Sequence, residues 1–436
     1  MSDSKRVLIV GGVAGGASCA ARLRRLDEKA AIVVFERGPY VSFATCGLPY
    51  YVGEVIQDEA KLLVATPESF RARFNIEVRT HSEVVRIDRA EGEIEVRDLG
   101  SGRVYREPYD ALVLAPGAEP IRPPLPGIDL PGVFTLRTIP DSRRIRDWMV
   151  EKQARRAVVA GGGFIGLEMA ENLSRRGLGV TIVEMADQLL PPLDPEMAEL
   201  VRQRLVAHRV GVELGGAVAA FEQTGEGLVV RTANGRALPA DIVILALGVR
   251  PESELAQAAG LDLGARGGIR VDERMRTSDP RIWAVGDAVE TRDLVTGEWG
   301  VVPLAGPANR QGRIAANAIC GRPGGFRGVQ ATAVCGVFGL TVAMTGASEK
   351  MLRRIGWTNY QAVYVHPGHH VGYYPGAQPI HLKLVFRASD GRILGAQAVG
   401  EEGVERRIDV ISMAIQKQGT VFDLEEAELC YTAAHN

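Results

Sequence analysis

The chain has 436 residues, 46% of them hydrophobic and 24% charged, which is enough for two or three domains with sizeable cores. The formal net charge is -2 and no block of like charges stands out, so the composition argues against a nucleic-acid or anionic-membrane partner. No apolar run reaches the roughly 20 residues of a membrane helix, and the cysteines are odd in number and scattered. We therefore expect a cytoplasmic protein with small-molecule partners and no membrane association.

The first forty residues predict a strand, a glycine-rich turn and a helix. The apolar strand VLIV (7–10) runs into GGVAGG (11–16), and a small-residue helix with a basic end follows. The next strand, AIVVF (31–35), ends at Glu36, where an acid meets a ribose hydroxyl in dinucleotide-binding folds. A secretory signal also starts with a basic residue and an apolar run, but the strand and glycines favour a nucleotide loop.

The stretch SFATCGLPYYVG (42–53) follows in the chain. It places Cys46 just before a predicted helix start, because Gly47 and Pro49 suit a first helical turn. No second cysteine lies nearby. A free cysteine is most often a small buried hydrophobic residue, but this setting favours a presented thiol.

The whole arrangement then recurs. The strand and turn AVVAGGGFIG (157–166) lead into a helix, and the strand after it ends at Glu184. Gly161, Gly163 and Gly166 match the full fingerprint, in which glycines allow the tight turn, the close approach to a pyrophosphate and helix packing. The first loop departs from it, since Val13 stands at the middle glycine position.

Each unit also closes in the same way. DALVLAPGAEP (110–120) and DIVILALGVRP (241–251) share one pattern, a buried strand that runs to a glycine. A third segment, TSDPRIWAVGDA (277–288), reads as a turn, a strand and a glycine-aspartate pair, and we expect Asp287 to open a helix there. Residues 326–436 lack a third glycine loop and mix strands with a helix whose apolar face suits dimer formation.

Over essentially its whole length the chain resembles the FAD-dependent pyridine nucleotide-disulfide oxidoreductases. The resemblance implies an α/β fold with two Rossmann-like dinucleotide-binding domains and a C-terminal α+β dimerisation domain, in a homodimeric flavoenzyme. It divides the chain into an FAD domain (1–120 and 249–325), an inserted NAD(P)H domain (121–248) and the interface domain (326–436). Whether a further domain follows residue 436 stays open.

The resemblance also implies the cofactor-binding residues. The first glycine loop, Glu36 and Asp287 would contact FAD, and the second loop and Glu184 the nicotinamide nucleotide. The carboxylate of Glu184 repels a 2′-phosphate, so NADH is expected first and NADPH stays open. The full expected set is Gly11, Gly12, Val13, Ala14, Gly15, Gly16, Glu36, Arg37, Ala115, Gly117, Gly161, Gly163, Phe164, Ile165, Gly166, Glu184, Gly248, Gly286 and Asp287.

Cys46 resembles the redox cysteine of the single-cysteine branch, which contains coenzyme A disulfide reductases, NADH oxidases and NADH peroxidases. With one protein thiol, the second sulfur must come from the substrate, or Cys46 must cycle through a sulfenic acid. Oxidases and peroxidases of the branch typically carry a histidine where this chain has Ala14. The resemblance therefore favours coenzyme A (CoA) disulfide or CoA-dependent persulfide reductases. An NADH oxidase, or an electron-transfer flavoprotein of the ferredoxin or rubredoxin reductase type, remains the alternative.

The remaining expectations concern the substrate, the proton donor and metals. By resemblance, Tyr373 and Tyr431 would supply protons, one of them across a dimer interface. The expected CoA-binding residues are Arg22, Ser42, Phe43, Thr45, Lys61 and Arg71, with Arg73 a weaker candidate. No metal is expected at His366, His369 and His370, because no carboxylate or cysteine has a matching spacing. Cys19, Cys320, Cys335 and Cys430 are interpreted as structural.

Overall fold

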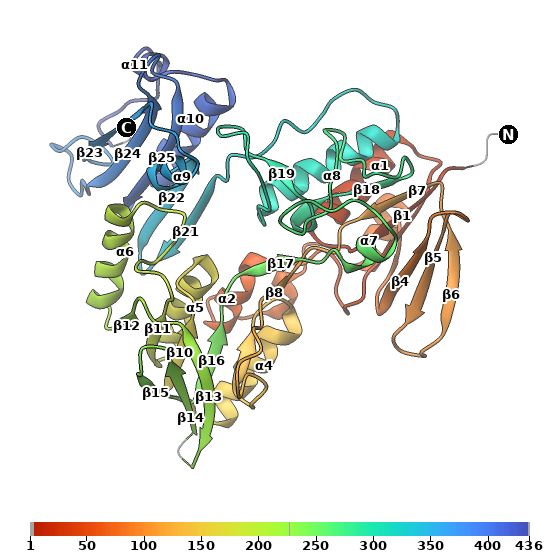
Figure 1. Ribbon diagram of the computed structural model, residues 1–436, viewed down its shortest axis with the longest axis horizontal. Helices are drawn as coiled ribbons and strands as arrows, with labels where there is room; N and C mark the ends of the chain where they lie inside the picture. The colour runs from red at the N-terminus through yellow and green to blue at the C-terminus, as the bar shows by residue number, and fades with distance from the viewer. Residues whose placement is uncertain (1–3, 226, 435–436) are drawn as a thin grey trace.

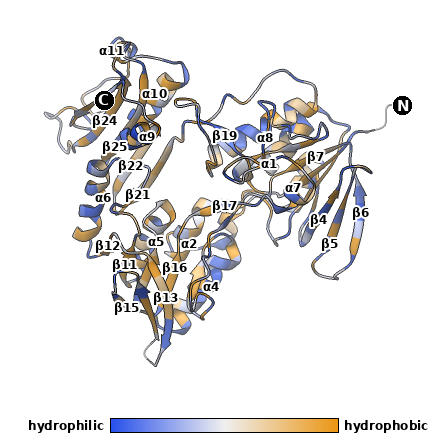
Figure 2. Cartoon of the chain, in the orientation of Figure 1, coloured by the Kyte–Doolittle hydropathy of each residue, from blue (hydrophilic) through white to orange (hydrophobic). Residues whose placement is uncertain are grey.

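The computed structural model describes residues 4–225 and 227–434 and consists of three units (Figure 1). The unit that contains β1 lies at the right of the figure, the unit that contains β10 at the bottom, and the C-terminal unit at the upper left. Hydrophobic residues run along inner strands such as β16, whereas the edge strand β6 is largely hydrophilic (Figure 2). Among the described residues, no helix combines the length and apolarity needed to cross a bilayer.

The first unit is built on a parallel sheet with the order β18-β7-β1-β2-β3. Its central strand β1 is almost fully buried, which agrees with its continuous apolar sequence. Strand β18 follows the second unit in the chain, so this sheet takes strands from both sides of that unit. An antiparallel sheet β4-β5-β6 lies beside it. The elements are β1 (Arg6–Val10), α1 (Ala14–Leu26), β2 (Ala31–Phe35), α2 (Leu48–Val52), α3 (Pro67–Phe74), β3 (Glu77–Arg79), β4 (Ser82–Asp88), β5 (Glu93–Asp98), β6 (Val104–Pro108), β7 (Ala111–Leu114), α7 (Glu254–Ala258), β18 (Ile282–Ala284) and α8 (Ala305–Ile319).

The second unit repeats the first. Its parallel sheet has the order β12-β11-β10-β16-β9, and an antiparallel sheet β13-β14-β15 accompanies it. The chain enters the second unit through β8 and leaves it through β17, and these two strands pair with each other in a short antiparallel ladder at the two crossings between the units. The elements are β8 (Ala118–Pro120), β9 (Val133–Thr135), α4 (Ile139–Glu151), β10 (Arg156–Ala160), α5 (Phe164–Arg175), β11 (Gly179–Val183), α6 (Pro195–Ala207), β12 (Gly211–Glu213), β13 (Val218–Thr224), β14 (Gly227–Thr232), β15 (Ala237–Ala240), β16 (Ile242–Leu245) and β17 (Val249–Pro251).

The C-terminal unit is an antiparallel sheet, β21-β22-β25-β24-β23, with α10 packed on it. Strand β25 is buried along its whole length, between α10 and the remaining structure. The elements are β21 (Ala333–Val337), β22 (Leu340–Gly346), α9 (Glu349–Arg354), β23 (Tyr360–Val365), β24 (Ile380–Arg387), β25 (Ile393–Gly400), α10 (Val404–Gln416) and α11 (Val421–Glu425). The separate short ladder of β19 (Thr291–Arg292) and β20 (Trp299–Gly300) precedes α8 in the chain, and β19 lies beside α8 in Figure 1.

The prediction that a helix begins at Asp287 is wrong. Residues Gly286–Ala288 form a single 3-10 turn, and Val289 after it is extended and bridges to Ile269. The φ of Gly286 is +82°, a left-handed conformation that a right-handed helix does not contain. The next helix in this unit, α8, begins at Ala305.

The contact between α2 and α5 joins the first two units and buries polar groups. A Cβ on Gly53 would lie 2.1 Å from the Asn172 side chain, so only glycine allows this approach. The Tyr50 hydroxyl donates a hydrogen bond to Glu168 at 3.4 Å. Burial raises the pKa of Glu168 to about 7 and, with the nearby Glu168 carboxyl, raises the pKa of Tyr50 to about 12. Glu168 is therefore a carboxyl group that titrates near neutral pH at a domain junction.

We predict that Glu168→Gln stabilises the protein at alkaline pH. The ordinary pKa of Glu168 is 4.5, so between pH 4.5 and about 7 the folded protein holds a proton that the unfolded chain has released. The cost of burying the carboxylate is thus complete above about pH 7 and absent below pH 4.5. The variant should gain on the order of 1–3 kcal/mol in unfolding free energy at pH 8. The gain should shrink at pH 5.5; denaturant unfolding at both values measures it, and an equal difference at both would contradict the assignment.

Candidate functional site

The two glycine loops have the same backbone geometry. A Cβ on Gly11 would lie 2.1 Å from the carbonyl oxygen of Ala115, and a Cβ on Gly161 would lie 2.1 Å from that of Ala246. The last glycines, Gly16 and Gly166, pack as closely against the first glycine of their own loop. The protein's own packing therefore requires the first and last glycine of each loop.

The middle loop position differs between the two units. A Cβ on Gly163 would meet no atom within 4 Å, so space is open beside the backbone at the start of α5. Phe164 and Ile165 begin that helix, and the side chain of Ile165 is exposed. In the first loop Val13 is the N-cap of α1, and Ala14 is the first helical residue. Both loops thus lead into a helix N-terminus, which suits the binding of a phosphate.

In each unit, the glutamate that follows the second strand of the parallel sheet accepts hydrogen bonds from the glycine loop of that unit and from the backbone two residues further on. Glu36 accepts hydrogen bonds from the backbone N–H of Gly12 at 3.0 Å and of Gly38 at 2.9 Å. Glu184 accepts in the same way from Gly162 at 2.7 Å and Ala186 at 2.8 Å. These bonds orient both carboxylates beside the loops, as ribose recognition requires.

The turn at Gly286 and Asp287 lies against the first loop. A Cβ on Gly15 would lie 2.9 Å from Val285, and the N–H of Gly286 donates to the buried side chain of Gln311 at 2.7 Å. Asp287 is half-buried, and burial raises its pKa. No hydrogen bond reaches its carboxylate from the residues that the structure describes, which suits a group that faces a ligand.

Three further predicted cofactor residues lie at the crossings between the two units. Gly117 and Gly248 have φ values of +85° and +99° and come just before β8 and β17. Arg37 forms an ion pair with Glu252 at 2.7 Å, so its guanidinium has a protein partner. Gly117 and Gly248 each come two residues after the carbonyl that a loop glycine contacts, which is compatible with a nucleotide contact.

Cys46 is exposed in the 3-10 turn Thr45–Gly47, directly before α2. The chain just before it is fastened to the first glycine loop, since the N–H of Ser42 donates to the carbonyl of Gly12 at 2.9 Å. Ser42 has a φ of 49°, which is unusual for a residue with a side chain. The thiol turn and the first nucleotide loop are therefore parts of one hydrogen-bonded assembly.

The other four cysteines have different surroundings. Cys19 and Cys335 are buried, and burial raises the pKa of both, that of Cys335 to about 12. Cys320 is half-buried, and its pKa is also raised by burial. Cys430 is exposed, so the expected structural role has no support from burial at this position.

Arg22 lies in a basic pocket that the sequence did not predict. The pocket has a volume of about 440 Å³, and four arginines from α1, α8 and residue 327 line it, with Phe326 beside them. No ion pair reaches any of the four from a described residue; Arg22 donates only to the Asn317 amide oxygen at 3.0 Å. Burial and the two neighbouring guanidinium groups lower the pKa of Arg310. The four are Arg22, Arg310, Arg313 and Arg327.

Uncompensated positive charge in a concave site suits an anionic ligand. Lys61 and Arg71 were predicted to bind CoA together with Arg22, but they are exposed and do not line this pocket. Phe43 is half-buried and bridges to Leu63, while Thr45 is exposed beside Cys46. Of the predicted substrate residues, the structure thus brings Ser42, Phe43 and Thr45 together at the thiol and Arg22 into the pocket.

Tyr373 and Tyr431 are brought together. Their hydroxyl oxygens lie 3.5 Å apart, and the hydrogen bond to Tyr431 raises the pKa of Tyr373. Both side chains are exposed. Tyr373 lies between β23 and β24, and these strands lie far from α2 in Figure 1. The pair is therefore remote from the thiol turn of its own chain.

The histidines contact each other and a nearby carboxylate. The Nδ1 atoms of His366 and His381 lie 2.9 Å apart, and His369 lies 3.3 Å from Glu402. In the described part of the chain, the one group with enough close ligand atoms for a cation consists of Asp194, Glu196 and Glu349. The Lys383 ammonium contacts all three carboxylates and occupies that place.

Similar proteins include two kinds of named enzyme. An NADH oxidase of Methanocaldococcus jannaschii is 38% identical over 98% of this chain and 94% of its own length. A coenzyme A disulfide reductase of Staphylococcus aureus (strain bovine RF122) is 34% identical over 99% of this chain and 96% of its own.

Two solved structures are also similar over nearly the whole chain. Reduced Bacillus anthracis CoADR-RHD has 49% identity and a TM-score of 0.97, with 99% of this chain and 78% of that chain covered. A NAD-dependent persulfide reductase from A. fulgidus has 40% identity and a TM-score of 0.95, with 99% and 80% covered.

The family match covers most of the sequence. Residues 5–312 match the pyridine nucleotide-disulphide oxidoreductases, and residues 332–431 match the dimerisation domain of the same family. The two glycine loops with their carboxylates and the antiparallel C-terminal sheet are in keeping with these matches. The chain is a member of the pyridine nucleotide-disulphide oxidoreductase family.

Proposed function

We propose that the protein is a homodimeric, NADH-dependent flavoprotein that reduces CoA disulfide or CoA persulfide through Cys46. The observation that carries the proposal is the unpaired arginine pocket around Arg22, together with an exposed thiol fastened to the first nucleotide loop. The names of the staphylococcal relative and of the persulfide reductase support the same substrate class. Scattered cysteines without disulfides support a cytoplasmic location.

The residues of the first unit fit FAD. The loop from Gly11 to Gly16 opens α1, Glu36 is oriented by Gly12, and the half-buried Asp287 carboxylate accepts no hydrogen bond from a described residue. These groups would hold the pyrophosphate, a ribose and the polar chain of the cofactor. When bound, FAD supplies two-electron chemistry that carries reducing equivalents from NADH to a disulfide.

The second loop fits NADH. Glu184 is held by two N–H groups beside the open space at Gly163, where it can accept a hydrogen bond from a 2′-hydroxyl. The exposed residue after it is Met185, which offers no positive charge to a 2′-phosphate. This arrangement supports NADH over NADPH.

Cys46 would act as the nucleophile. Its thiolate attacks one sulfur of CoA disulfide, so that a Cys46–CoA disulfide forms and the other CoA leaves as a thiolate, which takes up a proton. Two electrons from NADH then cleave the mixed disulfide and return Cys46 to the thiolate. The balanced reaction converts NADH, one proton and CoA disulfide into NAD⁺ and two CoA thiols.

The arginines would bind the phosphates of CoA. Arg22 lies eight residues after the start of α1, which is about 12 Å along the helix. The thiol turn is bonded to the loop that precedes the same helix. An elongated ligand with phosphates at one end and sulfur at the other suits two sites separated along one helix.

The tyrosines would donate protons across a dimer. Tyr373 and Tyr431 lie on the C-terminal unit, far from the thiol turn of their own chain. The match to a dimerisation domain and the exposed apolar residues Val363 and Val365 of β23 support a homodimer. In such a dimer the pair would serve the partner subunit's thiol and protonate the departing CoA thiolate.

Oxygen reduction is the second candidate function, because the relative from Methanocaldococcus jannaschii is named NADH oxidase. Mass spectrometry of the purified protein distinguishes the two. An added mass of CoA on Cys46 favours the reductase, and an added oxygen favours the oxidase.

Removal of the proposed nucleophile should abolish disulfide reduction and leave flavin reduction intact. Cys46→Ser should lower NADH-dependent reduction of CoA disulfide by about 10³-fold or more, because the mixed disulfide cannot form. NADH-dependent reduction of ferricyanide, which needs no thiol, should persist. Cys430→Ser removes the other exposed thiol and should keep disulfide reduction. Full disulfide reduction by Cys46→Ser would instead favour an electron-transfer flavoprotein.

Loss of one arginine from the pocket should weaken the binding of CoA disulfide but not of a disulfide without phosphates. Arg313→Ala should raise KM for CoA disulfide about 10- to 100-fold, since a hydrogen bond to a charged group contributes about 1.5–3 kcal/mol. KM for pantethine, which has the same disulfide but no phosphates, should not change. Arg73→Ala removes an exposed arginine outside the pocket and provides the control. Equal effects on both disulfides would contradict phosphate binding.

Mixed dimers distinguish catalysis across the dimer from catalysis within one chain. The double variant Tyr373→Phe/Tyr431→Phe and the variant Cys46→Ser should each be nearly inactive with CoA disulfide. Mixed dimers refolded from both chains should regain activity, because one thiol then faces an intact tyrosine pair on the partner. If the tyrosines served their own chain, mixing would restore nothing.

A further inference from the structure

The segment 185–193 connects the second nucleotide loop to the C-terminal unit. At its start, Glu184 is bonded to Gly162, and the N–H of Leu190 donates to the Gly162 carbonyl at 2.9 Å. A Cβ on Gly162 would lie 2.5 Å from Leu189, so the segment packs directly on the loop. A displacement of this segment would therefore also move the second glycine loop and the Glu184 carboxylate, which is expected to bind the ribose.

Gln188 stabilises the segment from within. Its side-chain amide donates to the carbonyls of Leu189, Leu190 and Leu193 at 3.3, 3.4 and 3.0 Å. Its amide oxygen accepts from the Lys350 ammonium at 3.0 Å. Lys350 belongs to α9 of the C-terminal unit, so this bond reaches across the domain boundary.

Asp194 fixes the far end of the segment. Its carboxylate is almost completely buried and accepts from the backbone N–H groups of Glu349 and Lys350 at 3.1 and 3.0 Å. Its own N–H donates to the Gln397 side chain at 2.8 Å, and that side chain donates back to the carboxylate at 2.8 Å. Asp194 thus caps α9 and pairs with β25, both in the C-terminal unit.

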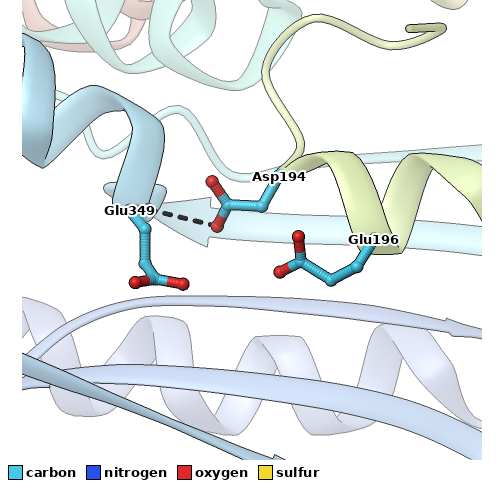
Figure 3. Close-up of side chains that lie close together, drawn as sticks. All are labelled: Asp194, Glu196 and Glu349. Carbon is cyan, nitrogen blue, oxygen red and sulfur yellow. Dashed lines mark hydrogen bonds between the residues drawn. The ribbon is translucent and has the colours of Figure 1, made fainter.

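Lys383 of β24 holds this junction together. Its side chain is fully buried, and its ammonium lies 2.7 Å from Asp194 and 2.6 Å from Glu349, with Glu196 as a third partner. Figure 3 shows the three carboxylates gathered from α6, α9 and the residue before α6. Burial alone would lower the pKa of Lys383, but the hydrogen bonds to the three carboxylates raise it above its ordinary value. The lysine stays charged and supplies the cation that the carboxylates need.

We propose that Lys383 and Lys350 are positioning residues for the NADH site, which they hold in place through Asp194, Gln188 and the segment between them. The inference rests on the NADH site proposed above and does not depend on the identity of the disulfide. Neither lysine needs to touch the nucleotide. The C-terminal unit would thereby influence how tightly the second glycine loop of its own chain binds NADH.

The experiment uses two variants of the holoenzyme. Lys350→Met removes only the bond to Gln188. Lys383→Met is combined with Glu196→Gln, so that one positive and one negative charge are lost together and the junction keeps its net charge. Lys417→Met, at the exposed C-cap of α10 in the same unit, is the matched control.

Calorimetric titration with NAD⁺ gives Kd, and steady-state kinetics gives KM for NADH and for CoA disulfide. Kd for NAD⁺ and KM for NADH should both rise about tenfold in the two variants, which corresponds to about 1.4 kcal/mol. The kcat and KM for CoA disulfide should stay within about twofold of the parent values. The control should match the parent protein in every measurement.

Two results with the variants would overturn the proposal. One is an unchanged Kd for NAD⁺ in Lys350→Met, which is the milder variant and keeps the Lys383 cluster intact. The other is an equal rise in the KM values of both substrates with a lower melting temperature, since this would show general loosening. If the parent protein itself fails to bind NAD⁺, the NADH assignment is at fault, and the inference falls with it.

Discussion

The contact between a glycine and a carbonyl oxygen at the end of the neighbouring strand is the constraint on which both nucleotide sites depend. Gly11 meets Ala115 and Gly161 meets Ala246 at distances that leave no room for a side chain. The contact fixes where each helix begins, and so where its free N–H groups point. The adjacent N–H groups of the loops then orient the two acids. In the first unit the same loop also anchors Ser42, four residues before the thiol.

Much of this could be predicted from the sequence because the signals are local. Strand, turn and helix follow each other within about twenty residues, and the ribose acids stand directly after buried strands. The exposed turn of Cys46 was also predictable, since Pro49 marks the first turn of α2. The helix expected at Asp287 failed because the left-handed Gly286 ends the strand in a tight turn, and glycine alone does not reveal its φ.

The basic pocket and the lysine junction could not be predicted, because each unites residues from distant parts of the chain. Arg22 meets Arg310, Arg313 and Arg327 only through the packing of α1 against α8, where Gly312 lies directly on Gly15. The chain is rich in arginine, so the sequence gives no reason to select these four before the structure shows that they line one pocket. Lys383 likewise meets carboxylates that lie up to 189 positions away, where no periodicity connects them.

These two clusters show how charge separates a ligand site from a structural one. Burial and the neighbouring Arg313 and Arg327 lower the pKa of Arg310, and no described acidic residue pairs with any of the four arginines, which suits an anionic ligand. The carboxylates around Lys383 already have a cation, and Asp194 also accepts hydrogen bonds from two backbone N–H groups, so no metal ion is required.

Strand β24 links two of the proposed roles of the C-terminal unit. It bears Lys383 near its start and follows the loop that presents Tyr373, so one strand contacts the nucleotide unit and supports the proposed proton donor. Under the proposed function, the C-terminal unit would therefore act on the NADH site and on the proton donor through one strand, in addition to its proposed role in the dimer.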